Sequence, residues 1–355
     1  MIRTINWLVF LFSGLIYGSV FISPEQFELS GILALCIPFT LITNFLLVAI
    51  CWLKSRKIQW AALLSAIAGL YFIPQLCQYH RLSPRTRGIQ VLSYNTRLMR
   101  SPKTEANTTK KWQYSDQLIE WIAQEPSPIK CFQEFYSDGR WKKLNVSKKL
   151  KVKGYHTFVL NYDEYAEDDE YSRGMAIFSK FPIVHQGQID INEDRLNQAI
   201  FADLLIGTQD TLRIYNLHLH SMGINQEQTI REPSKIYATI FKKFKNGQKV
   251  RSKQAREILE HILSSPHPVI VCGDFNDPPI SYNYQQYCRH LNNAFQSAGN
   301  GFGFTLHGPL FFLRIDQQFY SPSLGVEYFE TLRKVSFSDH FPIRGKYRLP
   351  NTSKK

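Results

Sequence analysis

The residues that could do chemistry gather in five polar clusters, each at the carboxyl end of an apolar run of the 355-residue chain. In chain order the clusters are Ser93-Tyr94-Asn95, Gln133-Glu134, Asn216-Leu217-His218, Gly273-Asp274-Phe275-Asn276-Asp277, and Arg314-Ile315-Asp316 with Ser338-Asp339-His340. Carboxylates, imidazoles and amides move protons or hold cations. Loops at strand ends are where a rigid sheet presents reactive groups, so the clusters are expected to form one site.

Taken in this order, the clusters resemble a known family. The most specific parts are Gly273-Asp274-Phe275-Asn276 and Ser338-Asp339-His340, with Gln133-Glu134 upstream, Asp316 on a strand between them, and the run from Ser172 to Lys180. This pattern is similar to the endonuclease/exonuclease/phosphatase superfamily. Its members include pancreatic-type deoxyribonucleases, abasic-site endonucleases, neutral sphingomyelinases and inositol polyphosphate 5-phosphatases. The resemblance covers residues from about 88 to 348.

The resemblance implies an enzyme that hydrolyses phosphoester bonds. This reaction needs a cation near the phosphoryl oxygens, a water in line with the leaving group, and support for the departing alkoxide. By analogy, Glu134, Asn95 and Asp339 would hold Mg²⁺, with Mn²⁺ as a substitute, because oxygen ligands suit a hard ion.

The resemblance also implies roles for the acid and base groups. Asp274 would position or deprotonate the attacking water. His340 would pair with Asp316, which fixes its tautomer and favours its charged form. His218 would act as the leaving-group acid or as a phosphate ligand. Asp274 and His340 both remain candidates for the general base.

Three side chains are expected to contact the substrate phosphate: Asn276, which also counts among the catalytic residues, Asn95 and Arg97. Arg97 departs from one subfamily, because abasic-site endonucleases carry an acid two residues beyond the Asn. A cation at this position suits contact with an anionic substrate. Abasic-site repair is therefore disfavoured.

Short β-rich runs alternate with polar and helical stretches from residue 88 onward. Strands are expected at residues 89–94, 129–132, 175–179, 199–205, 212–217, 269–272 and 314–319, and helices at 115–123 and 254–263. These runs predict an α+β class with much antiparallel sheet. The resemblance adds a four-layer α/β/β/α sandwich with two mixed, largely antiparallel sheets. We expect a linker at 81–87, this domain at 88–348 and a tail at 349–355.

An apolar segment precedes the expected domain. Residues 5–22, 31–53 and 58–76 contain no charged side chain. Each is roughly as long as the ~20 apolar residues that cross a ~30 Å hydrocarbon core. Residues 1–80 are therefore predicted to form three transmembrane helices that anchor the protein in a bilayer.

Charges in the loops predict an orientation for this anchor. Lys54, Arg56 and Lys57 lie between the second and third stretches, and Glu25 and Glu28 lie between the first and second. Basic loops face the cytoplasm. The protein is therefore expected to be a multi-pass integral membrane protein with its catalytic domain on the extracytoplasmic side.

The sequence leaves the substrate open. The part of the chain after residue 85 has 36 basic and 27 acidic residues, a net charge of +9. This charge and the basic stretches at 142–153 and 235–256 favour nucleic acid and nuclease-type hydrolysis of phosphodiester bonds. The anchor favours a phospholipid or sphingomyelin phosphodiesterase, or a phosphoinositide-type phosphatase. A third hypothesis is an inactive membrane protein that binds phosphate esters. No sequence feature indicates a protein partner.

Overall fold

The structure is a computed structural model of the chain, and it describes residues 2–55, 60–80, 88–99, 108–140, 144–162, 171–191, 197–221, 233–308 and 310–349. The expected linker at 81–87 and nearly all of the expected tail lie outside these residues. So do Arg56 and Lys57 of the basic turn.

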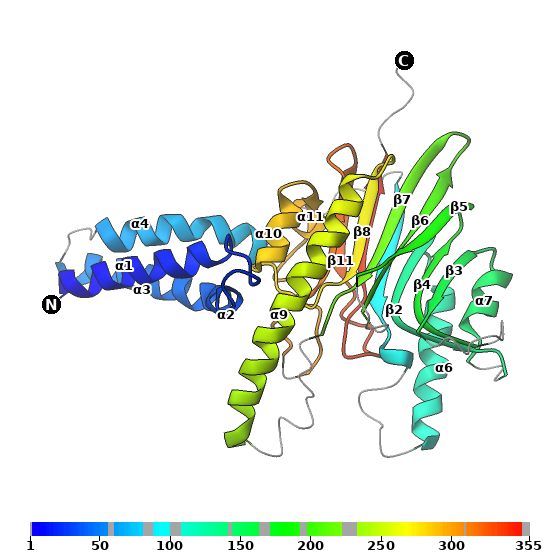
Figure 1. Cartoon of the computed structure of the whole chain (residues 1–355), viewed down its shortest axis with the longest axis horizontal. Helices are drawn as coiled ribbons and strands as arrows, with labels where there is room; N and C mark the ends of the chain where they lie inside the picture. Colours follow the sequence, from blue (N-terminus) through cyan, green and yellow to red (C-terminus); the bar gives the residue numbers. More distant parts are fainter. Residues whose placement is uncertain are drawn as a thin grey trace.

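The described residues form two six-stranded sheets, the first in the order β11-β12-β1-β2-β4-β3 (Figure 1). Its strands are β1 (Ile89–Asn95), β2 (Ile129–Asp138), β3 (His156–Asn161), β4 (Tyr171–Ser179), β11 (Gly325–Thr331) and β12 (Ile343–Arg348). β1 pairs with β2 in parallel, and the other neighbours are antiparallel. The carboxyl ends of β1 and β2 therefore meet at one edge.

The second sheet has the order β5-β6-β7-β8-β10-β9. Its strands are β5 (Ile183–Ile189), β6 (Gln198–Ile206), β7 (Asp210–His218), β8 (Val269–Asp274), β9 (Asn292–Asn293) and β10 (Asp316–Tyr320). Here β7 and β8 are the parallel pair. Each sheet thus combines one parallel pair with antiparallel neighbours, as the mixed-sheet expectation required.

Helices cover the outer faces of the two sheets, and the main apolar core lies between them (Figure 1). Helix α6 (Thr108–Gln124) and helix α7 (Val146–Val152) pack on the first sheet. Helix α9 (Pro233–Leu263) and helix α10 (Tyr282–Cys288) pack on the second, with the short α11 (Ala294–Ala298) nearby. The α/β/β/α sandwich is therefore confirmed.

The seven expected strands are present, but β3, β5, β11, β12 and the two-residue β9 were not expected. The expected strands were recognised as runs of consecutive apolar residues. β12 instead alternates buried and more exposed positions, and β5 has polar residues and a glycine at its centre. Likewise, the helix expected at 254–263 is only the carboxyl-terminal third of α9, because the rest of α9 is rich in lysine.

The amino-terminal segment is a helical bundle that projects away from the sheets (Figure 1). It contains α1 (Ile2–Ser19), α2 (Ser30–Leu35), α3 (Ile37–Ser55), α4 (Trp60–Gly69), the 3-10 helix η1 (Leu70–Phe72) and α5 (Ile73–Leu76). The second expected span is divided, because the chain turns at Cys36 between α2 and α3.

Three membrane spans are not supported by helix length. Within the described residues, one helix segment, Ile37–Lys54, is long and apolar enough to cross a membrane. The apolar segments Asn6–Ser19 and Trp60–Leu76 are shorter. A helix rises 1.5 Å per residue, so these two measure roughly 21 and 26 Å against a core of about 30 Å. The length and apolar composition of Ile37–Lys54 are therefore weak evidence for one membrane helix.

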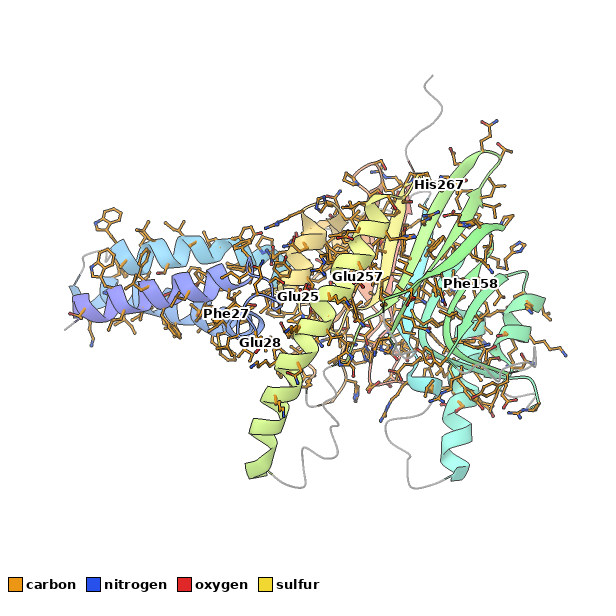
Figure 2. The ribbon with its side chains drawn as sticks, viewed as in Figure 1. Glu25, Phe27, Glu28, Phe158, Glu257 and His267 are labelled. Atoms are coloured by element: carbon orange, nitrogen blue, oxygen red, sulfur yellow. The ribbon has the colours of Figure 1, made fainter. Side chains whose placement is uncertain are left out.

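An acidic turn docks the bundle on the sandwich. Glu25 and Glu28 lie between α1 and α2, against the side of α9 (Figure 2). The Glu28 carboxylate lies 2.5 Å from Lys245 Nζ, and the Glu25 carboxylate lies 2.7 Å from an Arg256 guanidinium nitrogen. Lysines of the basic stretch at 235–256 are therefore engaged within the molecule.

A second contact joins the end of α5 to the loop that leads into β10. The buried Arg314 guanidinium donates to the Gln75 carbonyl, and the Gln285 amide donates to Gln75 Oε1 at 2.7 Å. Burial lowers the pKa of Arg314 to about 10. Arg314 also donates to the Phe302 carbonyl at 3.0 Å, so removal of the bundle would take away one of the two carbonyl partners of this buried cation.

Candidate active site

Strand register brings three of the expected residues into one row of the second sheet. His218 at the end of β7 pairs with Asp274 at the end of β8, and Asp274 pairs with Asp316 at the start of β10. In the first sheet, Asn95 at the end of β1 pairs with Gln133 on β2. The expected clusters therefore meet where the ends of the two sheets approach each other.

Three of the expected site residues adopt the left-handed backbone conformation: Arg97, with φ 48°, Glu134 and Asn276. The β2–β4 register shifts between Phe132 and Phe135, and Glu134 within this bulge has φ 47°. Asn276, two residues beyond β8, has φ 51°. Bulges redirect side chains, and strained backbone of this kind concentrates at functional sites. Glu134 and Asn276 therefore owe their positions to these local departures from regular strand.

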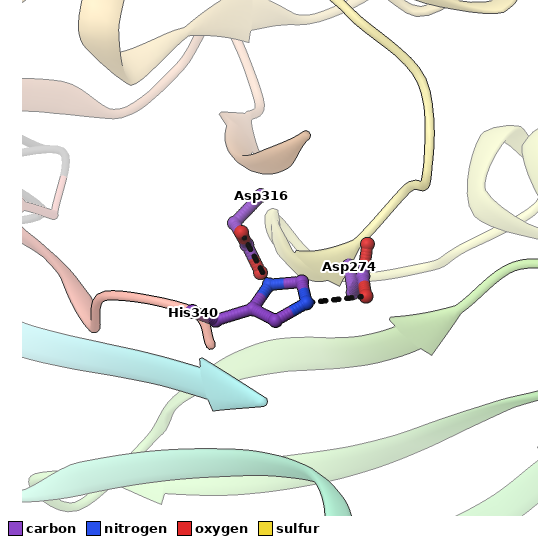
Figure 3. Close-up of side chains that lie close together, drawn as sticks. All are labelled: Asp274, Asp316 and His340. Atoms are coloured by element: carbon purple, nitrogen blue, oxygen red, sulfur yellow. Dashed lines mark hydrogen bonds and ion pairs between the residues drawn. The ribbon is translucent and has the colours of Figure 1, made fainter. Parts of the chain in front are cut away.

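His340 is buried between two carboxylates (Figure 3). Its Nδ1 lies 2.9 Å from Asp316 Oδ2, and its Nε2 lies 3.6 Å from Asp274 Oδ2. Burial favours the neutral ring, but Asp316 and Asp274 outweigh it and hold the pKa of His340 well above its ordinary value. The expected His340–Asp316 pair is present, and its histidine is held in the charged form.

Asp274 is the centre of the site. Its Oδ2 accepts from Asn95 Nδ2 at 3.0 Å and lies 3.8 Å from His218 Nε2, while its Oδ1 accepts from the Asn276 backbone N–H at 2.9 Å. Burial raises the pKa of Asp274 although His340 and His218 oppose the shift. Catalysis by the carboxylate form would therefore begin at a higher pH than for an ordinary aspartate.

Glu134 lies on the more open side of the centre. Its Oε1 is 3.3 Å from Asn95 Nδ2 and 3.8 Å from His218 Nε2, and about a third of the side chain is exposed. Asp339, the third expected metal ligand, lies beside Arg97, whose Nε is 3.6 Å from Asp339 Oδ2. The structure therefore brings Glu134 and Asn95 together and gives Asp339 a cationic neighbour.

Two groups of side chains could hold a divalent ion. Asp274, Asp316 and His340 offer ligand atoms that lie within 4.8 Å of one another. In that group Asp316 already bonds the imidazole, and Mg²⁺ prefers oxygen ligands. The Glu134–Asp274 side fits Mg²⁺ better, because it offers two carboxylates and Glu134 is accessible. Asn95 joins them through its Nδ2, which donates to both carboxylates, while its Oδ1 accepts from the Arg97 backbone N–H at 3.0 Å.

Asn276 is held more firmly than its expected role required. Its side-chain Nδ2 donates to the Leu219 carbonyl at 2.9 Å, just beyond His218. The side chain therefore links the β7 and β8 loops, and one N–H of its amide remains for an incoming phosphate oxygen. Phosphate contacts by Asn276, Asn95 and Arg97 stay predictions.

Sequence reasoning missed residues that support the site from beneath. The Thr305 hydroxyl accepts from the backbone N–H groups of Ile315 and Asp316, at 3.1 and 3.2 Å. The buried Gln133 amide donates to Asn216 Oδ1 at 2.5 Å and so joins the two sheets. Gln133 and Asn216 belong to the expected polar clusters, but no role was predicted for them. No sequence signal pointed to Thr305.

Gly273 is required by the close approach of β8 to β7. Its φ is +146°, and a Cβ there would lie 2.0 Å from the Leu217 carbonyl oxygen. We expect Gly273→Ala to lower the free energy of unfolding by about 3 kcal/mol or more, because strain adds to a backbone clash. Urea unfolding of the detergent-solubilised full chain measures the loss.

Gly207→Ala is the matched control for this prediction. Gly207 also has a positive φ, +71°, but a Cβ there meets no atom within 4 Å. Its substitution should cost only about 1 kcal/mol. Equal losses for the two variants would contradict the explanation from the clash with Leu217.

The family model described as Endonuclease/Exonuclease/phosphatase family matches residues 92–340. The chain therefore belongs to this family, whose class is that of hydrolases acting on phosphoester bonds and generally dependent on a divalent metal. A domain of unknown function matches residues 1–79. No curated protein matches the chain.

Solved structures share the fold of the sandwich. A family protein from Bacteroides thetaiotaomicron is 18% identical with a TM-score of 0.53, over 75% of this chain and 99% of that one. A mannosyl-6-phosphatase from the same organism is 19% identical with a TM-score of 0.51, over 74% and 100%. A family protein from Beutenbergia cavernae is 17% identical with a TM-score of 0.53, over 75% and 72%. At these identities the likeness concerns the fold.

Proposed function

We propose that this chain is a membrane-anchored, Mg²⁺-dependent hydrolase of phosphodiester bonds, with Mn²⁺ as a substitute ion. The observation that carries the proposal is the convergence on one buried carboxylate, Asp274, of a charged His340–Asp316 pair and of Asn95, which also reaches Glu134. A bound divalent ion would neutralise charge on the phosphoryl oxygens and support the departing alkoxide.

The chain's own residues would divide the remaining work. Glu134, Asn95 and Asp339 would hold the ion, and Asn95 would do so through its amide oxygen. Above its raised pKa, Asp274 accepts a hydrogen bond or proton from the attacking water. The charged His340 would donate a hydrogen bond or proton from Nε2, because its other ring nitrogen, Nδ1, faces Asp316.

Hydrolysis of bis(p-nitrophenyl) phosphate by the full chain in detergent tests the proposal. Turnover should require Mg²⁺ or Mn²⁺, disappear with EDTA, and fall by about 10²-fold or more in Glu134→Gln, because the metal then loses a carboxylate ligand. Glu257→Gln, which removes a partly exposed acid paired with Lys253 on α9, is the control and should retain activity. Undiminished turnover in EDTA would contradict the metal-dependent mechanism.

Nuclease action is the second candidate, and one observation favours it. Lys148, Lys151 and Lys153 are exposed at and just beyond α7. The other basic stretch offers weaker support, because Lys245 lies against Glu28 and Arg256 against Glu25. Nicking of supercoiled plasmid by the same preparation, tested at rising salt, decides between nucleic acid and other diesters.

The surface of the bundle supports membrane anchoring. Large apolar side chains on α1, α3 and α4 are 42–72% exposed: Trp7, Leu8, Leu11, Phe12, Leu15, Phe39, Ile42, Phe45, Leu46, Ile50, Trp52, Leu53, Trp60, Leu64 and Ile67. A water-soluble bundle would turn polar residues outward. Trp7, Trp52 and Trp60 lie toward the bundle's free end, and Phe21 and Tyr71 lie at the sandwich end. Aromatic residues at both ends suit the two interfaces of a bilayer.

We further propose that the catalytic domain is extracytoplasmic. The acidic turn at Glu25 and Glu28 docks on the sandwich, so both lie at the same end of the bundle, while Lys54 lies at the other end. In intact cells, Val152→Cys on the exposed end of α7 should react with a membrane-impermeant maleimide. The unsubstituted protein gives the background labelling. Protection of this cysteine until the cells are permeabilised would overturn the orientation.

A further inference from the structure

Arg251 is a fully buried cation in the middle of α9, behind the candidate active site. Its Nε donates to Asp277 Oδ1 at 3.0 Å, and one terminal nitrogen donates to the His220 carbonyl at 2.8 Å. The other Asp277 oxygen accepts from Asn283 Nδ2 at 2.6 Å. Two of the three guanidinium nitrogens thus have partners, while the buried Nη2 has none among the described residues. Burial of an arginine charge is tolerated because it is paired with a carboxylate.

The two partners of Arg251 belong to the two loops that carry reacting groups. Asp277 directly follows Asn276 on the loop after β8, and His220 lies two residues beyond His218 on the loop after β7. The loops also touch each other, because Asn276 Nδ2 donates to the Leu219 carbonyl at 2.9 Å. Arg251 therefore ties both loops together.

One face of α9 is shaped for this contact. Gln254 Oε1 accepts from the His220 backbone N–H at 2.9 Å. At Gly247, a Cβ would lie 3.2 Å from the Arg251 guanidinium and 3.5 Å from the Ser221 carbonyl. Positions 247, 251 and 254 follow helical spacing and thus share one side of the helix. The loop after β7 packs against that side of α9.

We infer that Arg251 is a positioning residue for phosphoester hydrolysis, which fixes His218 and Asn276 relative to Asp274. The inference rests on the proposed function. The planar guanidinium reaches a carboxylate and a carbonyl in different loops with two nitrogens, which a lysine ammonium on a flexible stem does not reproduce. Small displacements of groups around a reacting phosphate lower rates steeply, about 10²-fold for 1 Å.

A different side of the same helix carries the docking of the bundle. Ser252, the residue after Arg251, has its hydroxyl 3.3 Å from the Ser23 hydroxyl, and Lys245 and Arg256 bind the acidic turn. Because the helix that positions the catalytic loops is also the helix that receives the bundle, the test uses the full chain.

Arg251→Lys tests the inference, and Arg213→Lys is its matched control. Arg213 is also buried and bonds a buried carboxylate, that of Asp203, at 2.6 and 2.8 Å, but it stands at the start of β7, far along the strand from His218. With bis(p-nitrophenyl) phosphate and saturating Mg²⁺, Arg251→Lys should lower kcat by about 10- to 100-fold and leave KM within about twofold. Arg213→Lys should keep kcat within about twofold at a comparable loss of Tm.

A double variant separates positioning from simple loss of stability. In an Asn276→Ala background, Arg251→Lys should lower kcat much less than in the unsubstituted chain, because one of the two side chains that Arg251 positions is already missing. If Arg251→Lys does not fold, Asp277→Asn takes its place, with an expected fall in kcat of about fivefold or more. Wild-type kcat in the folded variant, equal losses for Arg251→Lys and Arg213→Lys, or additivity with Asn276→Ala would overturn the inference. An unsubstituted chain without turnover would instead contradict the proposed function.

Discussion

Replacing His340 with alanine is expected to lower kcat by about 10³-fold, within the range measured for general acid–base groups. The reason is local: the imidazole lies 3.6 Å from Asp274 and is held in its charged form by Asp316 at 2.9 Å. Without it, a cation that faces the site is lost, and two buried carboxylates are left close together.

The pH profile distinguishes this role from a general disturbance. The pKa values of Asp274 and His340 are both raised, so activity should rise as Asp274 loses its proton and fall again as His340 loses its own. In His340→Ala the alkaline fall should disappear while the acidic rise remains. Measurement at saturating Mg²⁺ is needed, because a bound cation lowers both pKa values.

His290→Ala is the control for the first prediction. His290 is exposed, beyond the end of α10, and should be replaceable without loss of kcat or change of profile. A His340→Ala protein with more than about a tenth of the original kcat would remove His340 from the mechanism.

Replacing Asp274 with asparagine is expected to lower kcat by about 10²- to 10⁴-fold without loss of folding stability. The carboxylate oxygens of Asp274 accept hydrogen bonds from Asn95 Nδ2 at 3.0 Å and from the Asn276 backbone N–H at 2.9 Å. They also face the imidazoles of His218 and His340. An amide of the same shape keeps the volume but accepts no proton from water at neutral pH.

The sign of the stability effect follows from the pKa. Because burial raises the pKa of Asp274, its charged form is disfavoured by folding at every pH above the ordinary aspartate range. The neutral amide of Asp274→Asn carries no such cost, so the Tm of this variant at pH 7 should equal or exceed that of the unsubstituted protein. Asp190→Asn, at an exposed position after β5, is the control for both readouts. A large fall in Tm together with kcat would identify Asp274 as a structural residue instead.

The identity of the polar residues at the strand ends was sufficient to predict most of the candidate site. Asp274, Asp316, His218 and Asn95 lie at strand ends, and in-register pairing of parallel and antiparallel strands must bring such residues to a common edge. Local sequence determines these positions because the side-chain period of a strand is short. His340 lies outside the strands, and its pairing with Asp316, which the family resemblance implied, is confirmed.

Contacts between distant segments could not be predicted in this way. The basic stretch at 235–256 looked like a surface for nucleic acid, yet Arg251 is buried under Asp277 and Lys245 meets Glu28 across more than two hundred residues of chain. The Thr305 hydroxyl accepts from the backbone N–H of Asp316, and no sequence motif predicts this contact. The sequence shows that a charged residue is present, but not whether its side chain faces water or pairs with another group.

The sequence by itself therefore determined the class of chemistry and the apolar character of residues 1–80, because residue type and short-range period decide both. Only the tertiary structure decided how the apolar segment divides into helices, which face of α9 receives the bundle, and which cations are left for a substrate. These outcomes depend on which distant groups reach each other with complementary charge and shape, and that is a property of the folded chain.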